Sequence, residues 1–199
     1  MTSIKNMTFN FRFFLIGILL SAAVLSAQTP KADISTVVAS GKMRGDTYEN
    51  AYFGIMISAP KAKFTTPSLV NAAGHRARLL NLVLDSGDGA KNYTIGLMAD
   101  SLENYPNLTP NVYLRSVRHS LERDGLITDR QEFPITISGV SFVGAMLKVP
   151  EKPNFGYYRG IYSTFLNGYV VSLEVQARTP EHIQELLSSA IKISSGHKQ

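Results

Sequence analysis

An asparagine–glycine pair near the end of the chain, Asn167-Gly168, constrains the fold more than any other sequence feature. It separates two strand-like runs, residues 158–166 and 169–178. A type I′ turn needs positive φ at both central positions, and Asn and Gly adopt that conformation most readily. Along the second run, apolar and polar residues alternate, which is typical of a strand with one buried and one wet face. The pattern therefore predicts an antiparallel sheet.

A second strand pair is predicted over residues 79–98. Residues 79–84 are apolar at nearly every position, which is typical of a central strand covered on both faces. Residues 85–89 read Asp-Ser-Gly-Asp-Gly, a dense cluster of turn formers, and residues 93–98 form the returning strand. Another alternating stretch lies between residues 135 and 149. The chain is thus predicted to be rich in strands.

Two amphipathic helices are predicted, and both begin with the same signal. Thr109 precedes Pro110 and Thr179 precedes Pro180, so each threonine is the expected N-cap of a helix whose first residue is proline. Gly125 stands where a C-terminal glycine ends the first helix. The apolar stripes comprise Tyr113, Leu114, Val117 and Leu121 in the first helix, and Ile183, Leu186, Leu187, Ala190 and Ile191 in the second.

Many strands and few helices predict an α+β sandwich and exclude a doubly wound parallel sheet. We expect one domain over residues 45–194, a mobile polar spacer over residues 28–44 and a short tail over residues 195–199. The opposite face of the first helix carries Arg115, Arg118, Glu122 and Arg123, with His119 beside them. A solvated charged face is expected there, with an anion site as the alternative.

Residues 1–27 have the pattern of a signal peptide. Lys5 and Arg12 form the positive start, residues 13–25 are apolar, and small residues precede a cleavage site predicted after Ala27. The apolar run is shorter than the ~20 residues of a spanning helix, although an uncleaved anchor remains the alternative. We therefore expect a periplasmic or secreted protein with no stable membrane insertion after cleavage.

Composition narrows the function further. The chain has no Cys, which excludes disulfides, thiolate nucleophiles and a lipidated cysteine. Without Lys5 and Arg12 the formal net charge falls from +5 to +3, and no dense basic run accompanies it. Such a balance does not indicate nucleic-acid binding. His75, His119, His182 and His197 are dispersed without metal-binding spacing, so neither a metal nor another cofactor is expected.

Residues 45–60 read Gly-Asp-Thr-Tyr-Glu-Asn-Ala-Tyr-Phe-Gly-Ile-Met-Ile-Ser-Ala-Pro. This stretch resembles the opening hairpin of PsbP/Mog1-like domains, especially short exported bacterial proteins of unassigned function. Those domains tend to carry Gly-Trp after the proline, where this chain reads Lys61-Ala62-Lys63-Phe64. The resemblance, over roughly residues 42–194, implies an α/β/α sandwich around an antiparallel sheet, a role in assembly or binding, and no catalytic residue set. Tyr48, Asn50, Tyr52 and Phe53 are expected to build the hairpin.

Aromatic residues crowd around the last hairpin and form the candidate ligand-binding surface. Tyrosine combines an apolar body with a polar tip and suits recognition surfaces. The alternative is structural, because cross-strand aromatic pairs also stabilise hairpins. The candidate ligand-binding residues are Tyr158, Arg159, Tyr162 and Tyr169.

Asp85 suggests a different class of function. Val83 to Gly87 resembles the active-site turn of an aspartic protease, in which two carboxylates share a proton. The chain holds one copy, so catalysis would require a dimer. A calcium loop through Asp85, Asp88 and Asn92 lacks the regular spacing of acidic ligands. The sequence therefore favours an exported, non-enzymatic binding or assembly module for another envelope protein or a small ligand, with an Asp85 hydrolase as the alternative.

Overall fold

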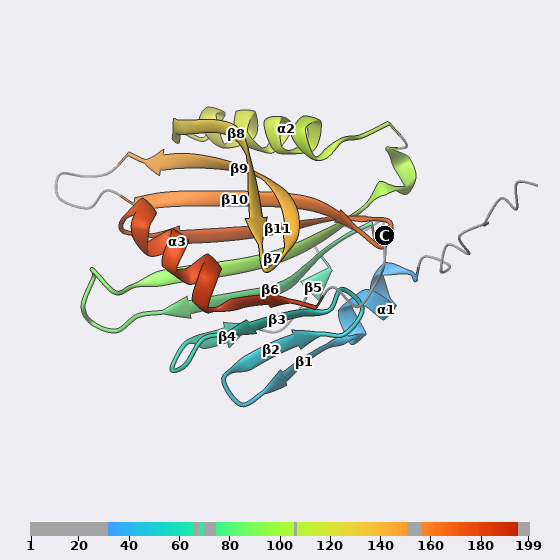
Figure 1. The fold of residues 1–199 in the computed structure, drawn as a ribbon, viewed down its shortest axis with the longest axis horizontal. Coiled ribbons are helices and arrows are strands. Elements are labelled where there is room, and N and C mark those ends of the chain that lie inside the picture. The colour runs from blue at the N-terminus through green and yellow to red at the C-terminus, as the bar shows by residue number, and fades with distance from the viewer. Residues whose placement is uncertain (1–31, 66–67, 70–74, 106, 151–156, 195–199) are drawn as a thin grey trace, which may run out of the picture.

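Two antiparallel sheets and three α-helices make up the part of the chain that the structure describes (Figure 1). The predicted α+β class with a mainly antiparallel sheet is therefore confirmed. The predicted signal peptide and the predicted tail lie outside the described residues. The structure, a computed structural model, describes residues 32–65, 68–69, 75–105, 107–150 and 157–194.

The large sheet has the strand order β4-β6-β7-β11-β10-β9-β8, with β5 also paired to β6. A small sheet has the order β1-β2-β3-β12, so the last strand of the domain pairs with a strand near its start. The large-sheet strands are β4 (Lys63–Thr65), β5 (Ser68–Leu69), β6 (Arg76–Leu84), β7 (Tyr93–Ser101), β8 (Ile127–Ile137), β9 (Val140–Val149), β10 (Tyr157–Leu166) and β11 (Tyr169–Ala177). The small-sheet strands are β1 (Gly41–Arg44), β2 (Thr47–Asn50), β3 (Ile55–Ser58) and β12 (Ile191–Ile193).

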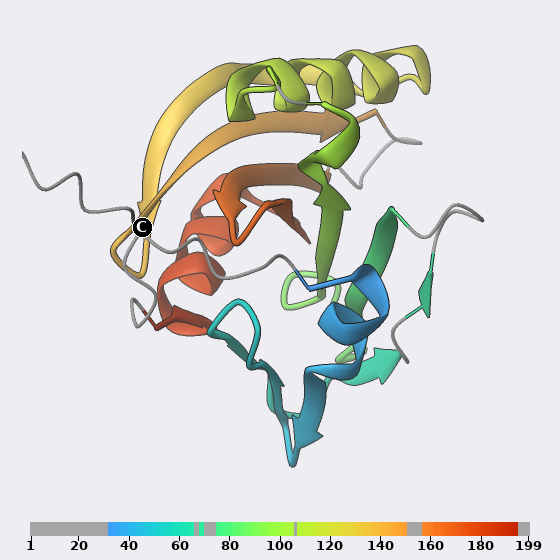
Figure 2. The same ribbon diagram turned by 90° about the vertical axis from the view of Figure 1, so that its right-hand side faces the viewer.

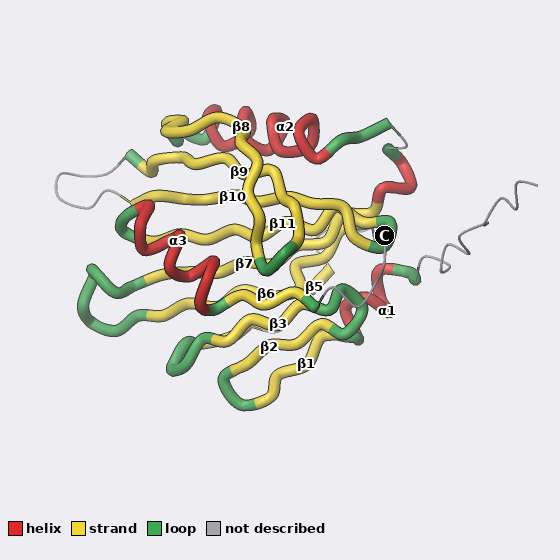
Figure 3. The backbone as a smooth tube through the Cα atoms, in the orientation of Figure 1, coloured by secondary structure: helices red, strands yellow, loops and turns green. Residues whose placement is uncertain are grey.

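Helices lie on both faces of the large sheet. Helix α2 (Pro110–Arg123) packs on β8, β9 and β10, whereas α3 (Pro180–Ser189) packs on β10 and β11. Helix α1 (Ile34–Ala39) contacts β6, and a short 3-10 helix (Leu102–Asn104) follows β7. Figure 2 shows that the large sheet curves, with α2 on its outer face and α3 on its inner face. Figure 3 shows the same arrangement with the helices in red and the strands in yellow.

Side chains that alternate along β9 and β10 pack on both faces of the large sheet. Leu147 and Ile161 pack with Leu114 of α2 in a small cluster on the outer face. Met146 and Tyr162 are their neighbours in sequence and belong to the main core on the inner face. Successive side chains of a strand point to opposite faces, so a pair of adjacent residues contributes to both layers.

The local signals for turns and helix ends are confirmed. Asn167 and Gly168 have φ values of 50° and 80°, and they join β10 to β11 in the predicted hairpin. Thr109 caps α2 by accepting a hydrogen bond from the Val112 amide, and Thr179 caps α3 in the same way. Gly125 has a φ of 93° just beyond the end of α2. These features depend on a few adjacent residues, which is why the sequence pattern locates them.

The predicted spacer over residues 28–44 is wrong from residue 32 onward. Helix α1 is capped by Asp33, whose carboxylate accepts a hydrogen bond from the Thr36 amide at 2.7 Å. Val37 is fully buried, and β1 pairs with β2. The helix is too short to show a periodic apolar pattern, and its burial depends on contacts with distant β6. The structured domain thus begins before residue 45.

Candidate functional site

The predicted aromatic surface is not formed as one surface. Tyr162 and Tyr169 are buried in the core, with exposed fractions of 0% and 1%. Tyr158 is half-buried on the inner face, whereas Arg159 lies on the outer face and donates a hydrogen bond to Gln176 at 3.2 Å. The period of two along β10 separates Arg159 from its tyrosine neighbours. The structural alternative, in which these aromatic residues pack, holds for Tyr162 and Tyr169.

Tyr169 instead joins the early hairpin to the core. Its ring makes edge contacts with Tyr52 and Phe53, at centroid distances of 6.1 and 5.8 Å. Its hydroxyl donates a hydrogen bond to the carbonyl of Ala32 at 2.6 Å. Asn50 is buried, and its side-chain oxygen accepts a hydrogen bond from the Phe53 amide. The prediction that residues 45–60 build a packed hairpin is therefore confirmed.

A cleft of about 350 Å³ lies between β8, β9 and the first turns of α3. A volume of this order is typical of sites for small ligands. In Figure 2 the ribbons of β8 and β9 curve over the side of the sheet on which α3 lies. We refer to this feature as the cleft. Its lining residues are Asp129, Arg130, Phe133, Pro134, Ile135, Met146, Pro180 and Gln184.

Irregular pairing bends β8 over the inner face. The register between β8 and β9 shifts between Thr128 and Arg130 and again between Arg130 and Phe133. Bulges of this kind bend a strand and redirect its side chains. Pro134 is tolerated because β8 is an edge strand, where a missing amide breaks no ladder. The bulges thus allow Asp129 and Arg130, which are adjacent in sequence, both to line the cleft.

Two glycines make room for the aromatic residues behind the cleft. A Cβ atom on Gly144 would lie 2.9 Å from the rings of both Phe133 and Tyr162. A Cβ atom on Gly160 would lie 2.7 Å from Cε2 of Tyr162. The two rings meet edge to face, with their centroids 6.4 Å apart. The lack of a Cβ atom thus leaves room for the Tyr162 ring at both glycines and for the Phe133 ring at Gly144.

Arg130 is held against the aromatic wall of the cleft. Its guanidinium carbon lies 3.9 Å from the centroid of the Phe133 ring, a cation–π geometry. Among the described residues, neither Arg130 nor the exposed Asp129 takes part in an ion pair. The cleft thus combines apolar walls with two exposed charges for which the described residues supply no ion-pair partner.

The hydroxyl of Tyr162 is the one buried side-chain polar atom among the described residues that has no hydrogen-bond partner. Burial raises the pKa of Tyr162, and the charge of Arg130 opposes that shift. The hydroxyl lies against Gly160, which is paired with Met146, and Met146 is paired with Arg130. Met146 therefore stands between this hydroxyl and Arg130 in one cross-strand row.

Tyr162→Phe is expected to leave the free energy of unfolding unchanged or to raise it by up to about 1 kcal/mol, because it removes an unsatisfied buried polar group. Urea unfolding measures this. Tyr169→Phe is the matched control, and it should lose about 1 kcal/mol because the Tyr169 hydroxyl is bonded to Ala32. An equal loss in both variants would show that the Tyr162 hydroxyl has a partner.

The sequence pattern predicted a solvated charged face on α2, but only part of this face is solvated in the structure. Arg118 is only 6% exposed and binds two carboxylates, Glu122 at 2.6 Å and Glu132 of β8 at 2.9 Å. His119 also contacts Glu122, at 2.9 Å. Since its guanidinium is already occupied, Arg118 serves to attach α2 to β8 and offers no anion site. The sequence pattern missed this because Glu132 reaches α2 only through the fold.

Stability is expected to fall as the pH drops from about 4.5 towards 2. Hydrogen bonds, the strongest from Thr128, lower the pKa of Glu122 from 4.5 to about 2. A carboxylate with a lowered folded-state pKa stabilises the fold above its unfolded pKa, and this contribution is lost as it becomes protonated. Urea midpoints between pH 6 and pH 2.5 measure the effect. Thr128→Val should reduce this pH dependence, and an unchanged dependence would contradict the assignment.

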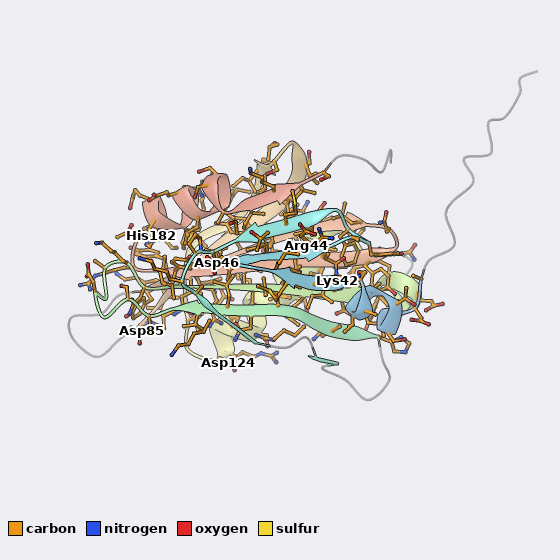
Figure 4. All side chains as sticks on the ribbon, turned by 90° about the horizontal axis from the view of Figure 1, so that it is seen from below. Lys42, Arg44, Asp46, Asp85, Asp124 and His182 are labelled. Atoms are coloured by element: carbon orange, nitrogen blue, oxygen red, sulfur yellow. The ribbon has the colours of Figure 1, made fainter. Side chains whose placement is uncertain are left out.

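Asp85 lies on the exposed loop between β6 and β7, at the end of the sheet (Figure 4). Its carboxylate accepts hydrogen bonds from the Gly87 amide and the Asn92 side chain, both at 3.2 Å. The Asp88 carboxylate accepts a hydrogen bond from the Ala90 amide at 3.0 Å. These bonds shape a polar turn. Among the described residues, no group of three potential ligands from His, Cys, Asp and Glu is placed to hold a metal ion.

Comparison with known proteins adds little to this geometry. The chain matches no protein-family model and no curated protein. One solved structure that resembles it is LpqN, described as involved in cell envelope biogenesis of Mycobacterium tuberculosis. The match covers 83% of this chain and 99% of that chain, with 14% identity and a TM-score of 0.44. A likeness at this level carries no argument about function, and the resemblance to PsbP/Mog1-like domains stays a prediction.

Proposed function

We propose that the chain is an exported, non-enzymatic binding module of the cell envelope, and that it takes a small ligand in the cleft. The observation that carries this proposal is the cleft itself, with its apolar walls and with two charges, on Asp129 and Arg130, that form no ion pair in the described part of the chain. Ligand sites in proteins are commonly concave and mostly apolar, with a few polar groups that orient the ligand. Of the two partners that the sequence suggested, an envelope protein or a small ligand, the cleft favours the small ligand.

Export is supported by the sequence of residues 1–27, with its charged start, apolar centre and small residues before Ala27. None of the helices among the described residues has the length and apolar character needed to cross a bilayer. Mass spectrometry of the protein from its native source should find Gln28 as the first residue. A protein that still begins at Met1 would contradict cleavage.

The cleft is tested by filling it from an exposed position. Gln184 lines the cleft and lies on the solvent side of α3, so Gln184→Trp is expected to occupy the cleft without disturbing the core. Glu185→Trp, the next residue, is exposed but does not line the cleft and serves as the matched control. Native mass spectrometry of the exported protein should detect a bound small molecule in the wild type and the control, but not in Gln184→Trp. A ligand that Gln184→Trp retains, or none in any of the three proteins, would contradict the proposal.

The absence of catalysis by Asp85 is a separate expectation. Its carboxylate is engaged in the turn between β6 and β7. We expect no peptide cleavage by the exported protein on a broad peptide panel at acid pH, and Asp85→Asn should behave like the wild type. Cleavage that disappears in Asp85→Asn would favour the hydrolase alternative.

A further inference from the structure

We propose that the ligand of the cleft is an organic anion, in which a carboxylate bound by Arg130 is attached to an apolar body that lies between Phe133 and Met146. This inference rests on the proposed function, since it names the chemical class that the cleft would take. It also predicts that the charge of Arg130 strengthens ligand binding and that the charge of Asp129 weakens it.

The position of Arg130 is the first part of the argument. The Phe133 ring supports one face of the guanidinium, which leaves the N–H groups at its edge for a ligand. Those N–H groups form a planar fork that matches both oxygens of a carboxylate. Because Phe133 is itself fixed against Tyr162 and Gly144, the guanidinium is held before a ligand arrives. A side chain ordered in advance loses little conformational entropy on binding.

The apolar body is indicated by the walls. Phe133 and Met146 keep exposed fractions of 7% and 4%, and Ile135 beside them is half-buried. Methionine is flexible and polarizable, so it adapts to aromatic or aliphatic groups. The parts of these side chains that face the cleft are apolar, so an aryl or alkyl carboxylate contacts them while its charge lies at Arg130.

The remaining charges act in opposite directions. The cleft includes Pro180, the first residue of α3, where the positive end of the helix dipole favours an anion and the negative charge of Glu181 in the same turn opposes it. Asp129, like Arg130, is exposed, and its negative charge repels an anion through solvent. An anionic ligand therefore requires that neutralising Arg130 weakens binding and that neutralising Asp129 strengthens it. A cationic ligand requires the reverse.

Three probes with the same body test this inference, namely 4-phenylbutyrate, 4-phenylbutan-1-ol and 4-phenylbutylamine. Calorimetric titration of the exported protein at low salt should show that the carboxylate binds about two- to fivefold more tightly than the alcohol, the size expected for an ion pair with the exposed Arg130. The amine should bind most weakly. Arg130→Gln should abolish the advantage of the carboxylate over the alcohol, and Asp129→Asn should tighten carboxylate binding about two- to threefold, as expected for an exposed charge.

The outcomes separate this inference from the proposed function. Equal binding of the carboxylate and the alcohol, both lost in Gln184→Trp, would overturn the anion preference and leave the cleft as a binding site. Tightest binding of the amine, lost in Asp129→Asn, would overturn it in favour of a cation site. Failure of all three probes, in a protein that carries a native ligand displaced by Gln184→Trp, would overturn the ligand class alone. If that native ligand is missing as well, both proposals fall.

Discussion

Gly160→Ala is expected to lower the free energy of unfolding by about 2–3 kcal/mol, the upper range for overpacking a core. The added Cβ atom would lie 2.7 Å from Cε2 and 2.8 Å from Cζ of Tyr162, which is closer than real Cβ contacts. Tyr162 has an exposed fraction of 0%, so its ring is enclosed by other side chains and must displace them in order to move. Urea unfolding of the variant and the wild type measures the loss.

Gly96→Ala is the matched control, because Gly96 is also a buried strand glycine without a positive φ. There the nearest heavy atom, Cβ of Glu174, would lie at 3.6 Å, an ordinary contact. This variant should be as stable as the wild type or slightly more stable, since alanine restricts the unfolded chain. Equal losses at Gly160 and Gly96 would contradict the packing of Tyr162 over Gly160.

Arg118→Ala is expected to lower the free energy of unfolding by about 3–5 kcal/mol, the range for removing one partner of a buried ion pair. The variant removes the ion-pair partner of the Glu132 carboxylate. Because the side chain of Glu132 is only 13% exposed, water cannot fully replace that partner. It also breaks the contact that attaches α2 to β8. Thermal and urea unfolding measure the effect.

Arg115→Ala tests the same helix at an exposed position. Substitutions at such positions usually change stability by no more than about 0.5 kcal/mol. A loss at Arg118 as small as the loss at Arg115 would show that Arg118 is solvated, as its place on the polar stripe of α2 had suggested. The contrast between the two arginines therefore measures the burial of the network directly.

The sequence predicted those parts of the fold that depend on adjacent residues. Thr109 with Pro110 and Asn167 with Gly168 determine a helix start and a turn through local backbone preferences, and both were located correctly. Helix α1 was missed because Val37 is buried by contacts with β6, far away in the sequence. Short elements held by distant contacts leave little periodic pattern.

The cleft was not predicted from the sequence for a related reason. It joins side chains from β8, β9 and α3, and the bulges that bend β8 have no simple sequence signature. The pair Gly144 and Gly160 offered one signal, since a glycine within a strand often marks a close approach of another group. The aromatic residues near the last hairpin were predicted to form a ligand-binding surface, with packing as the alternative. Packing holds for Tyr162, which lies behind the cleft, and for Tyr169, which belongs to another part of the core.

Methyl NMR of the methionines tests ligand binding in the cleft most directly. Met146 lines the cleft, whereas Met43, Met56 and Met98 lie on β1, β3 and β7 and serve as internal controls. In the protein without residues 1–27, labelled with 13C at the methionine methyl groups, addition of 4-phenylbutyrate should shift the Met146 signal to saturation while the signals of Met43, Met56 and Met98 stay in place. A Met146 signal that does not move, or equal shifts of all four signals, would contradict binding in the cleft.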